Sequence, residues 1–173
     1  MSIEDIEKAI KALRGATHKE VSWAQKIILA SGAHAAGDVI AEAASGSTPW
    51  TFDLKGVGYI TKAVLVAAAT AITPRVVAFL YSNSPTCELD DADPSLQPVA
   101  GDVLSFVGTI AFPALTSIGS GSSYAVATPS TYGNLPLPFS VSKLYVVLVT
   151  LDIVDFTDYS KMTLILSADV EDN

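Results

Sequence analysis

The stretch LYVVLVTL, Leu144 to Leu151, decides the fold class of this chain. Valine and leucine fill it, with no helical repeat and no alternation of polar and apolar residues. A second run, MTLILS at 162–167, has the same character. Short apolar runs rich in β-branched residues are typical of strands that are covered on both faces or lie in the middle of a sheet. We therefore expect a β protein built around these two strands.

Other strand-like segments surround these two runs. In KEVSWAQKIIL, residues 19–29, the apolar Val21, Trp23, Ile27 and Leu29 share one parity, which indicates a half-buried strand. Six more segments have strand character, at 38–43, 49–54, 57–68, 75–82, 102–111 and 122–128, and the two apolar runs extend to strands at 143–152 and 161–169. Pieces rich in Gly, Pro, Ser and Asn, such as ASGSTP and SNSPT, separate them. About nine short strands with so little helix predict an all-β, antiparallel β-sandwich or barrel.

The first residues have a different pattern. Ser2 can cap a helix that Gly15 ends, and the apolar residues of this segment fall on one helical face. That face consists of Ile3, Ile6, Ile10 and Leu13. Two parts are therefore expected, a helical arm at 1–18 and one sandwich domain at 19–173. A helix this short is marginal alone, so its apolar stripe needs a surface, either its own sandwich or a neighbouring subunit.

Composition and charge exclude several classes of function. Half of the residues are hydrophobic and 16% are charged, but the longest apolar run, 63–69, is too short to cross a bilayer. The first ten residues lack the apolar core of a secretion signal. Residues 1–30 hold five basic and four acidic side chains, whereas residues 31–173 hold five basic and fourteen acidic ones. Such an acidic body repels a phosphate backbone, so a nucleic acid is not an expected partner, and the short apolar run makes a membrane an unexpected one as well.

The segment TPSTYGNLPLPFS, residues 128–140, combines prolines with bulky apolar side chains. Each proline restricts its own φ and pushes the preceding residue toward an extended shape, so the segment is stiff without ladder hydrogen bonds. Its apolar residues are Tyr132, Leu135, Leu137 and Phe139. They either close an open end of the sandwich or form an interface with another protein, and the pattern does not separate these alternatives.

Residues with catalytic chemistry are few. The chain has one cysteine, Cys87, and two histidines, His18 and His34. It contains no G-x-S-x-G, H-E-x-x-H or phosphate-loop motif. A lone cysteine can form neither an internal disulfide nor a zinc site by itself, which fits a reducing cytoplasm. We therefore expect a protein that is not an enzyme, with no catalytic residues, no structural metal and no cofactor.

Two acidic groups and two tryptophans leave other functions open. The loop CELDDADPS could hold Ca²⁺ through carboxylates at 88–93, although it lacks the glycine and the closing glutamate of an EF-hand loop. Asp152, Asp155 and Asp158 could supply a carboxylate pair for glycan hydrolysis. Trp23 and Trp50 could stack on a sugar, but both lie in strand patterns where a core role is commoner.

Several short strings between residues 36 and 152 carry a resemblance to a family. AAGDVIAEA, PWTFD, GYITKAVLV, TPRVVAFLYSNSPTC, GTIAFPAL, ATPSTYGNLPLPF and LYVVLVTLD resemble small virion proteins of tailed bacteriophages, of the head decoration (cement) type. The resemblance implies a jelly-roll-like β-sandwich and a non-enzymatic role on the outer capsid surface. There such proteins lie at junctions between major capsid subunits and stabilise the shell. It implies assembly in the host bacterial cytoplasm and brings no catalytic residue with it.

The implied partners are the major capsid protein and further copies of this chain. The contact residues expected from the sequence are those of the arm and of the proline-rich segment: Ile3, Ile6, Ile10, Leu13, Tyr132, Leu135, Leu137 and Phe139. Two alternatives remain. One is a tail, baseplate or head-fibre protein that recognises a host glycan through Trp23, Trp50 or exposed tyrosines. The other is a β-sandwich glycan hydrolase that uses a pair of the aspartates named above.

Overall fold

The computed structural model describes residues 18–28, 32–54, 56–119, 121–129, 134–156 and 161–171, and the structural statements below concern these residues. Its elements are β1 (His18–Ile28), β2 (Gly32–His34), β3 (Val39–Ile40), β4 (Trp50–Asp53), β5 (Gly58–Ala67), β6 (Val76–Tyr81), the 3₁₀ helix η1 (Ala100–Asp102), β7 (Phe106–Phe112), β8 (Thr116–Ile118), β9 (Ser122–Ala127), β10 (Leu137–Phe139), β11 (Lys143–Thr150), β12 (Val154–Phe156) and β13 (Lys161–Glu171). The predicted arm helix, with Ile3, Ile6, Ile10 and Leu13, lies outside the described residues.

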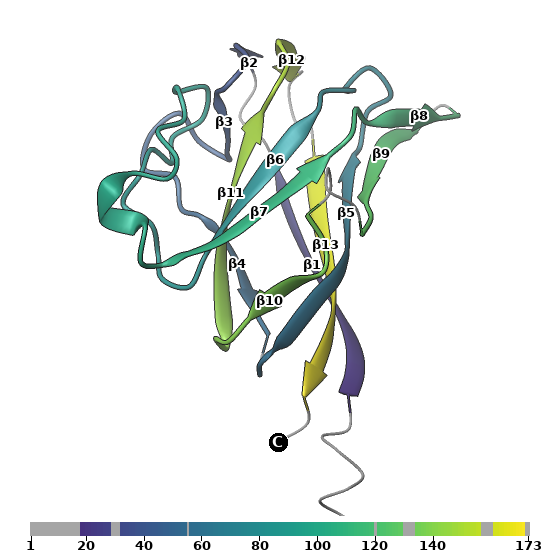
Figure 1. The fold of residues 1–173 in the computed structure, drawn as a ribbon. Helices are drawn as coiled ribbons and strands as arrows, with labels where there is room; N and C mark the ends of the chain where they lie inside the picture. Colours follow the sequence, from purple (N-terminus) through teal and green to yellow (C-terminus); the bar gives the residue numbers. More distant parts are fainter. Residues whose placement is uncertain are drawn as a thin grey trace, which may run out of the picture.

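Two antiparallel sheets face each other (Figure 1). One sheet has the order β1-β13-β5-β9-β8, with β10 beside the first half of β5. The other has the order β3-β11-β6-β7, with β4 beside the first half of β11. Successive segments of the chain cross between the sheets, so that β1, β5, β9 and β13 face β4, β6, β7 and β11. Eight main strands paired in this interleaved order form a jelly roll, which confirms the expected all-β, jelly-roll-like antiparallel sandwich.

The core lies between the two sheets and is made of side chains from both. Alternate residues of β5 and β13 point inward, as the burial pattern of each strand shows. On the opposite sheet, Leu144, Val146 and Leu148 of β11 belong to the same buried cluster. A continuous apolar cluster of this kind provides the main favourable contribution to folding.

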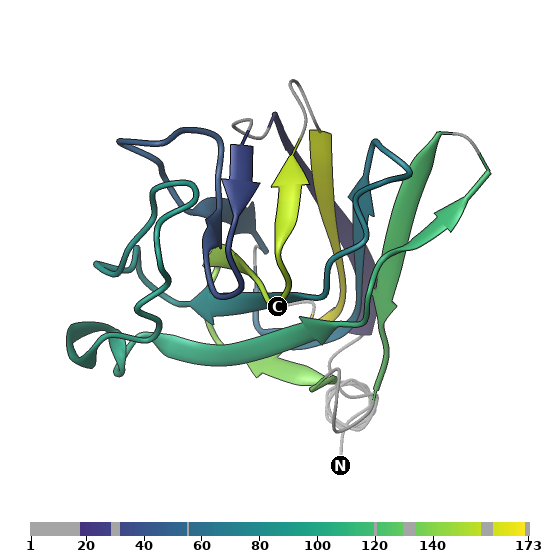
Figure 2. The ribbon, with the colours of Figure 1, turned by 90° about the horizontal axis from the view of Figure 1, so that it is seen from above.

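The outer face of the β3-β11-β6-β7 sheet is also buried. Residues 82–105, which connect β6 to β7 and are called the covering loop below, lie on the side of the sandwich away from β13 and β5 (Figures 1 and 2). Val147 of β11 and Tyr81 of β6 pack there with Cys87 of the loop. This second layer explains why LYVVLVTL shows no alternation, because both faces of β11 are covered.

Apart from shifts of one or two residues at strand ends, the structure has four short strands that were not expected, a β3 of two residues where a strand was expected at 38–43, and one displaced strand start. β2, β8, β10 and β12 have three residues each and were not expected. The strand expected from residue 102 begins only at Phe106, because Asp102 ends η1. In the proline-rich segment, Pro138 lies opposite Tyr59 in the β10–β5 ladder. A proline fits there because β10 has no ladder partner on its other side among the described strands.

Within the described ranges, none of the helices has the length and apolar character needed to span a membrane.

Candidate functional site

The covering loop is held by a buried carboxylate at its base. Asp102 is 3% exposed, and its two carboxylate oxygens accept hydrogen bonds from the backbone N–H groups of Thr86 (2.9 Å) and Cys87 (3.0 Å). The Thr86 hydroxyl donates a further bond of 3.0 Å. Hydrogen bonds to an ionised carboxylate are stronger than neutral ones. They tie the two ends of the covering loop together, so the residues that follow Asp102 are held in a defined position.

Cys87 lies in this anchored region and is 7% exposed. Burial, together with the negative charge of Asp102, raises the pKa of the Cys87 thiol to about 11. A thiol rather than a thiolate is therefore present at neutral pH, and it is a poor nucleophile. Cys87 serves as a packing residue beside Tyr81, whose pKa is also raised by burial.

A second anchor joins the covering loop to β2. The buried His34 has one ring nitrogen, Nε2, 3.0 Å from Asp91 Oδ1, and the other, Nδ1, 3.2 Å from the Gly32 carbonyl. Asp91 Oδ1 also accepts the Ala41 N–H at 2.6 Å, and the imidazole meets the Phe156 ring edge-on at 4.8 Å. Both ring nitrogens face acceptors, so the geometry fits a protonated imidazole that donates at both positions.

Electrostatics at His34 agree with this geometry. Burial of the ring acts to lower its pKa, but the hydrogen bond and charge of Asp91, the Gly32 carbonyl and the charge of Asp38 together outweigh burial, and the pKa of His34 is raised. The unfolded chain has the ordinary histidine pKa of about 6.5. The contribution of this anchor to stability is therefore complete below that pH and is lost as the pH rises through the higher folded pKa.

Replacing His34 with glutamine should remove this pH dependence. The melting temperature of the wild type should fall relative to that of His34→Gln as the pH is raised from about 6 to about 9. Thermal unfolding of both proteins across this range measures the difference, and the comparison removes every contribution that the two proteins share. A constant difference between the two melting temperatures would contradict a protonated His34.

Beyond Asp102, the covering loop exposes apolar side chains. Leu104 is fully exposed and Val103 is 56% exposed; these two residues are called the apolar tip below. Leu96, earlier in the loop, is 63% exposed. Leu104 also borders a groove of about 410 Å³ between the start of β7 and the end of β10. The groove has no charged lining residue among Ser82, Leu104, Ser105, Phe106, Val107, Pro138, Phe139, Ser140 and Val141. Exposed apolar side chains beside an uncharged groove are typical of a protein contact surface.

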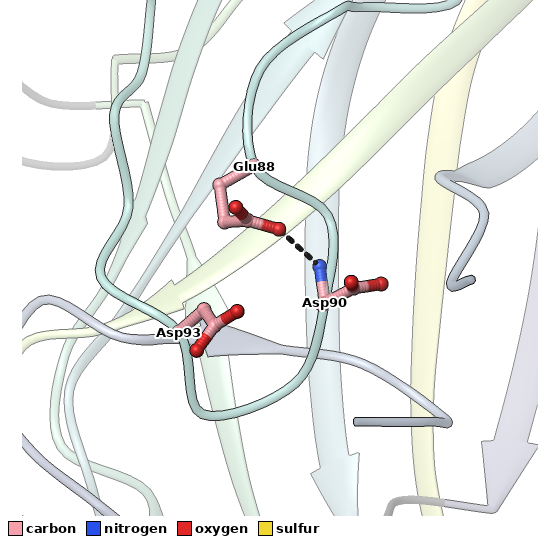
Figure 3. Close-up of side chains that lie close together, drawn as sticks. All are labelled: Glu88, Asp90 and Asp93. Atoms are coloured by element: carbon pink, nitrogen blue, oxygen red, sulfur yellow. Dashed lines mark hydrogen bonds between the residues drawn. The ribbon is translucent and has the colours of Figure 1, made fainter. Parts of the chain in front are cut away.

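Acidic residues in the middle of the covering loop come together as the sequence analysis allowed. Oxygens of Glu88, Asp90 and Asp93 all lie within 4.8 Å of one another (Figure 3). Glu88 Oε1 accepts the N–H groups of Leu89 and Asp90, both at 2.9 Å, and Asp90 Oδ1 accepts the Ser47 N–H at 2.9 Å. The carboxylates thus stabilise the turn itself, and calcium binding at 88–93 stays a hypothesis.

Two of the aspartates considered for glycan hydrolysis, Asp152 and Asp155, line the same cavity of about 400 Å³, and hydrolysis by such a pair stays a hypothesis. The Arg75 guanidinium donates to both carboxylate oxygens of Asp152, with the shortest contact at 2.6 Å. These hydrogen bonds lower the pKa of Asp152 to about 2, so it stays ionised and is unsuited to act as a general acid at neutral pH. Asp155 is exposed in β12, and Asp158 lies outside the described residues.

The other residues singled out in the sequence have the following positions. Leu135, Leu137 and Phe139 are 5–7% exposed and belong to the main core, so their side chains fill the sandwich and have little surface left for a partner. Tyr132 lies outside the described residues. Trp50 is 3% exposed and cannot stack on a sugar. Trp23 lies in β1 opposite Leu166.

The apolar tip is not apparent from the strand pattern of the sequence. Val103 and Leu104 both fall within the strand expected at 102–111. The useful signal was the pair Gly101-Asp102 before them, which favours a turn over a strand start.

No protein-family model matches the chain, and no curated protein sequence matches it significantly. Similar solved structures include a chain of Desmodium yellow mottle tymovirus, at 14% identity and TM-score 0.28, which covers 92% of this chain and 91% of that one. They also include a chain of the semi-empty VLP of the nodavirus of the giant freshwater prawn Macrobrachium rosenbergii, at 9% identity and TM-score 0.29, with 90% and 86% covered.

A chain of Mud crab tombus-like virus has 9% identity and a TM-score of 0.29, with 95% of this chain and 98% of that chain covered. TM-scores of this size support no inference about function. The fold assignment rests on the strand order described above.

Proposed function

We propose that this chain is a structural protein of a tailed-phage virion, a head decoration or cement protein that binds the outer surface of the shell at junctions between major capsid subunits. The observation that carries the proposal is the apolar tip, with Leu104 fully exposed on a loop that the buried Asp102 anchors. Apolar side chains exposed to water are unfavourable, and their burial against a partner surface lowers the free energy. Because the loop is already held in place, little entropy is lost on binding. The sequence resemblance supplies the shell as that partner.

The rest of the molecule supports a binding role over an enzymatic one. The space between the sheets is occupied by apolar side chains, which leaves the surface to carry the function. Among the described residues, the two buried partners that resemble catalytic groups, His34 and Asp91, are used to hold the covering loop. The net charge of −8 disfavours contact with DNA. Arm residues Ile3, Ile6, Ile10 and Leu13 stay a proposed second contact with the shell or with sister subunits.

The copy number in purified particles tests the proposed location. Quantitative mass spectrometry against the major capsid protein should find the chain in amounts comparable to shell subunits. A few copies per particle would instead place it at the tail or a vertex, and complete absence would remove the virion assignment. In the same particles, deletion of residues 1–15 tests whether the arm contributes to attachment.

Replacing Leu104 with glutamate should weaken shell binding at least about tenfold, because the contact would bury a carboxylate without a partner. The melting temperature should not change, since the Leu104 side chain is fully exposed and does not pack in the core. Cosedimentation with shells that lack the protein measures the occupancy. Ile153→Glu is the matched control, because Ile153 is 83% exposed, directly precedes β12 and is not among the residues that line the groove beside Leu104. Equal binding by the wild type and Leu104→Glu would contradict the proposed contact.

A further inference from the structure

The edges of the two sheets are not alike. β8 has three residues, and β3 and β4 have two and four, so three of the edge strands are short. The β7 edge is interrupted, because its register with β6 shifts and the Asn134 side chain donates to the Thr109 carbonyl at 2.7 Å. β1 differs from all of these. It has eleven residues, an unbroken register with β13 and, among the described strands, a ladder partner on one side only.

A long regular edge offers a row of backbone donors and acceptors to another strand. Charged residues normally protect such edges, and β1 carries Lys19, Glu20 and Lys26. Their spacing, however, matches a second copy of the same strand. If two β1 strands pair antiparallel about Trp23, Glu20 of each copy lies opposite Lys26 of the other. A shift by one residue in one direction sets Lys19 opposite Lys26, and in the other direction it sets Glu20 opposite Ile27.

We propose that two copies of this chain associate by antiparallel pairing of their β1 strands around a two-fold axis at Trp23. The partner of the open edge is then a second copy. Of the three registers compared, only the one centred on Trp23 places Glu20 of each copy opposite Lys26 of the other. Opposite charges placed directly across an antiparallel pair are favourable, and like charges are unfavourable. With a net charge of −8, two copies of the chain repel each other. Their association is therefore favoured at a contact that pairs opposite charges.

The side chains on the outer face of β1 leave room for this contact. Glu20, Ser22 and Ala24 are exposed. In the proposed register Ser22 of one copy lies opposite Ala24 of the other, and both are small. The result is one continuous sheet that runs through both molecules, while the apolar tip on the covering loop stays outside the contact. The inference therefore does not rest on the proposed shell-binding function.

Charge reversal at the edge tests the pairing. Glu20→Lys should weaken self-association at least about tenfold, because it places like charges opposite each other twice per dimer. The fold should tolerate the change, since Glu20 lies opposite the acidic Asp169 in its own sheet. The double variant Glu20→Lys/Lys26→Glu should regain the wild-type association constant to within about threefold, because it restores both pairs. Sedimentation equilibrium of the full chain measures all three proteins.

Glu42→Lys is the matched control, since Glu42 is exposed, lies outside β1 and gives the same change in net charge. It should leave self-association unchanged or slightly stronger. A wild type that stays monomeric at about 100 µM, well above the micromolar range of weak specific dimers, would overturn the proposal. So would equal effects of Glu20→Lys and Glu42→Lys, or a double variant that stays as weak as Glu20→Lys.

A disulfide test reports the register directly. Mixing Ser22→Cys protein with Ala24→Cys protein should give a disulfide-linked dimer on mild oxidation, since opposite residues have Cβ atoms about 4.5–5.5 Å apart. Either variant alone should form much less, because its two cysteines are offset along the strands. The native Cys87 gives little background, as it is buried with a raised thiol pKa. Equal cross-linking by single variants and by the mixture would overturn the register.

Discussion

Gly58→Ala is expected to lower the free energy of unfolding by about 3 kcal/mol or more, one of the largest effects of any single substitution in this protein. Gly58 lies in β5 between β10 and β13, opposite Val170. A Cβ atom added there would be 2.0 Å from the backbone oxygen of Asp169 and 3.0 Å from the Val170 Cα. These are backbone atoms in a sheet, so relief requires that the two strands separate and lose ladder hydrogen bonds.

Gly121→Ala is the control for Gly58→Ala, because a Cβ at Gly121 meets nothing within 4 Å. Its effect should stay within about 0.5 kcal/mol. Chemical denaturation of both variants gives the comparison. Since the total stability of a domain is about 5–15 kcal/mol, Gly58→Ala removes a large share of it. A loss below about 1 kcal/mol would show that β5 and β13 adjust at this position more easily than the close approach of their backbones implies.

Leu148→Ala is expected to cost about 3–5 kcal/mol. Leu148 is fully buried in β11, the strand with neighbours on both sides, and it faces the main core. Truncation leaves a cavity. Hydrogen-bonded ladders to both neighbouring strands hold β11 in place, so the cavity cannot collapse, and its cost adds to the transfer free energy lost with the side chain. Urea unfolding measures the loss of stability.

Ile153→Ala provides the comparison for Leu148→Ala, because it removes a similar aliphatic side chain from a position that is 83% exposed. Its effect should lie within about 0.5 kcal/mol. If both variants lost similar stability, the assignment of Leu148 to a rigid, fully packed core would be wrong.

Most of the strands could be predicted because their own residues carry the signal. The runs around Leu148 and Leu164 are apolar enough to identify central strands without any partner. Ladder partners are a different matter, since β1 pairs with β13, more than a hundred residues away in the sequence, and nothing in either strand specifies the other. The three-residue strands were missed because three residues are too few to show a period.

The candidate site was harder to predict than the fold. In the sequence Asp91 looks like an ordinary loop acid and Asp102 like the first residue of a strand, and only the tertiary structure brings Thr86, Cys87 and His34 to them. The residues of the proline-rich segment show the opposite case. Leu137 and Phe139 are expected as partner contacts from the flanking prolines. In the structure they belong to β10, which pairs with β5, and both side chains are buried. The prolines make the segment stiff, but its position in the fold depends on its pairing with β5.

The pairing of β1 with β13 also affects how the chain reaches its native state. Ser22 and Ser167, whose hydroxyls bond at 2.8 Å, are 145 residues apart in the sequence. During synthesis β1 is available long before its ladder partner, and contacts between such distant segments slow the folding of β proteins. Both edges of β1 stay open over that period, which exposes the nascent chain to pairing with the wrong strand. The β1 ladder can therefore form only after residues 161–171 have left the ribosome.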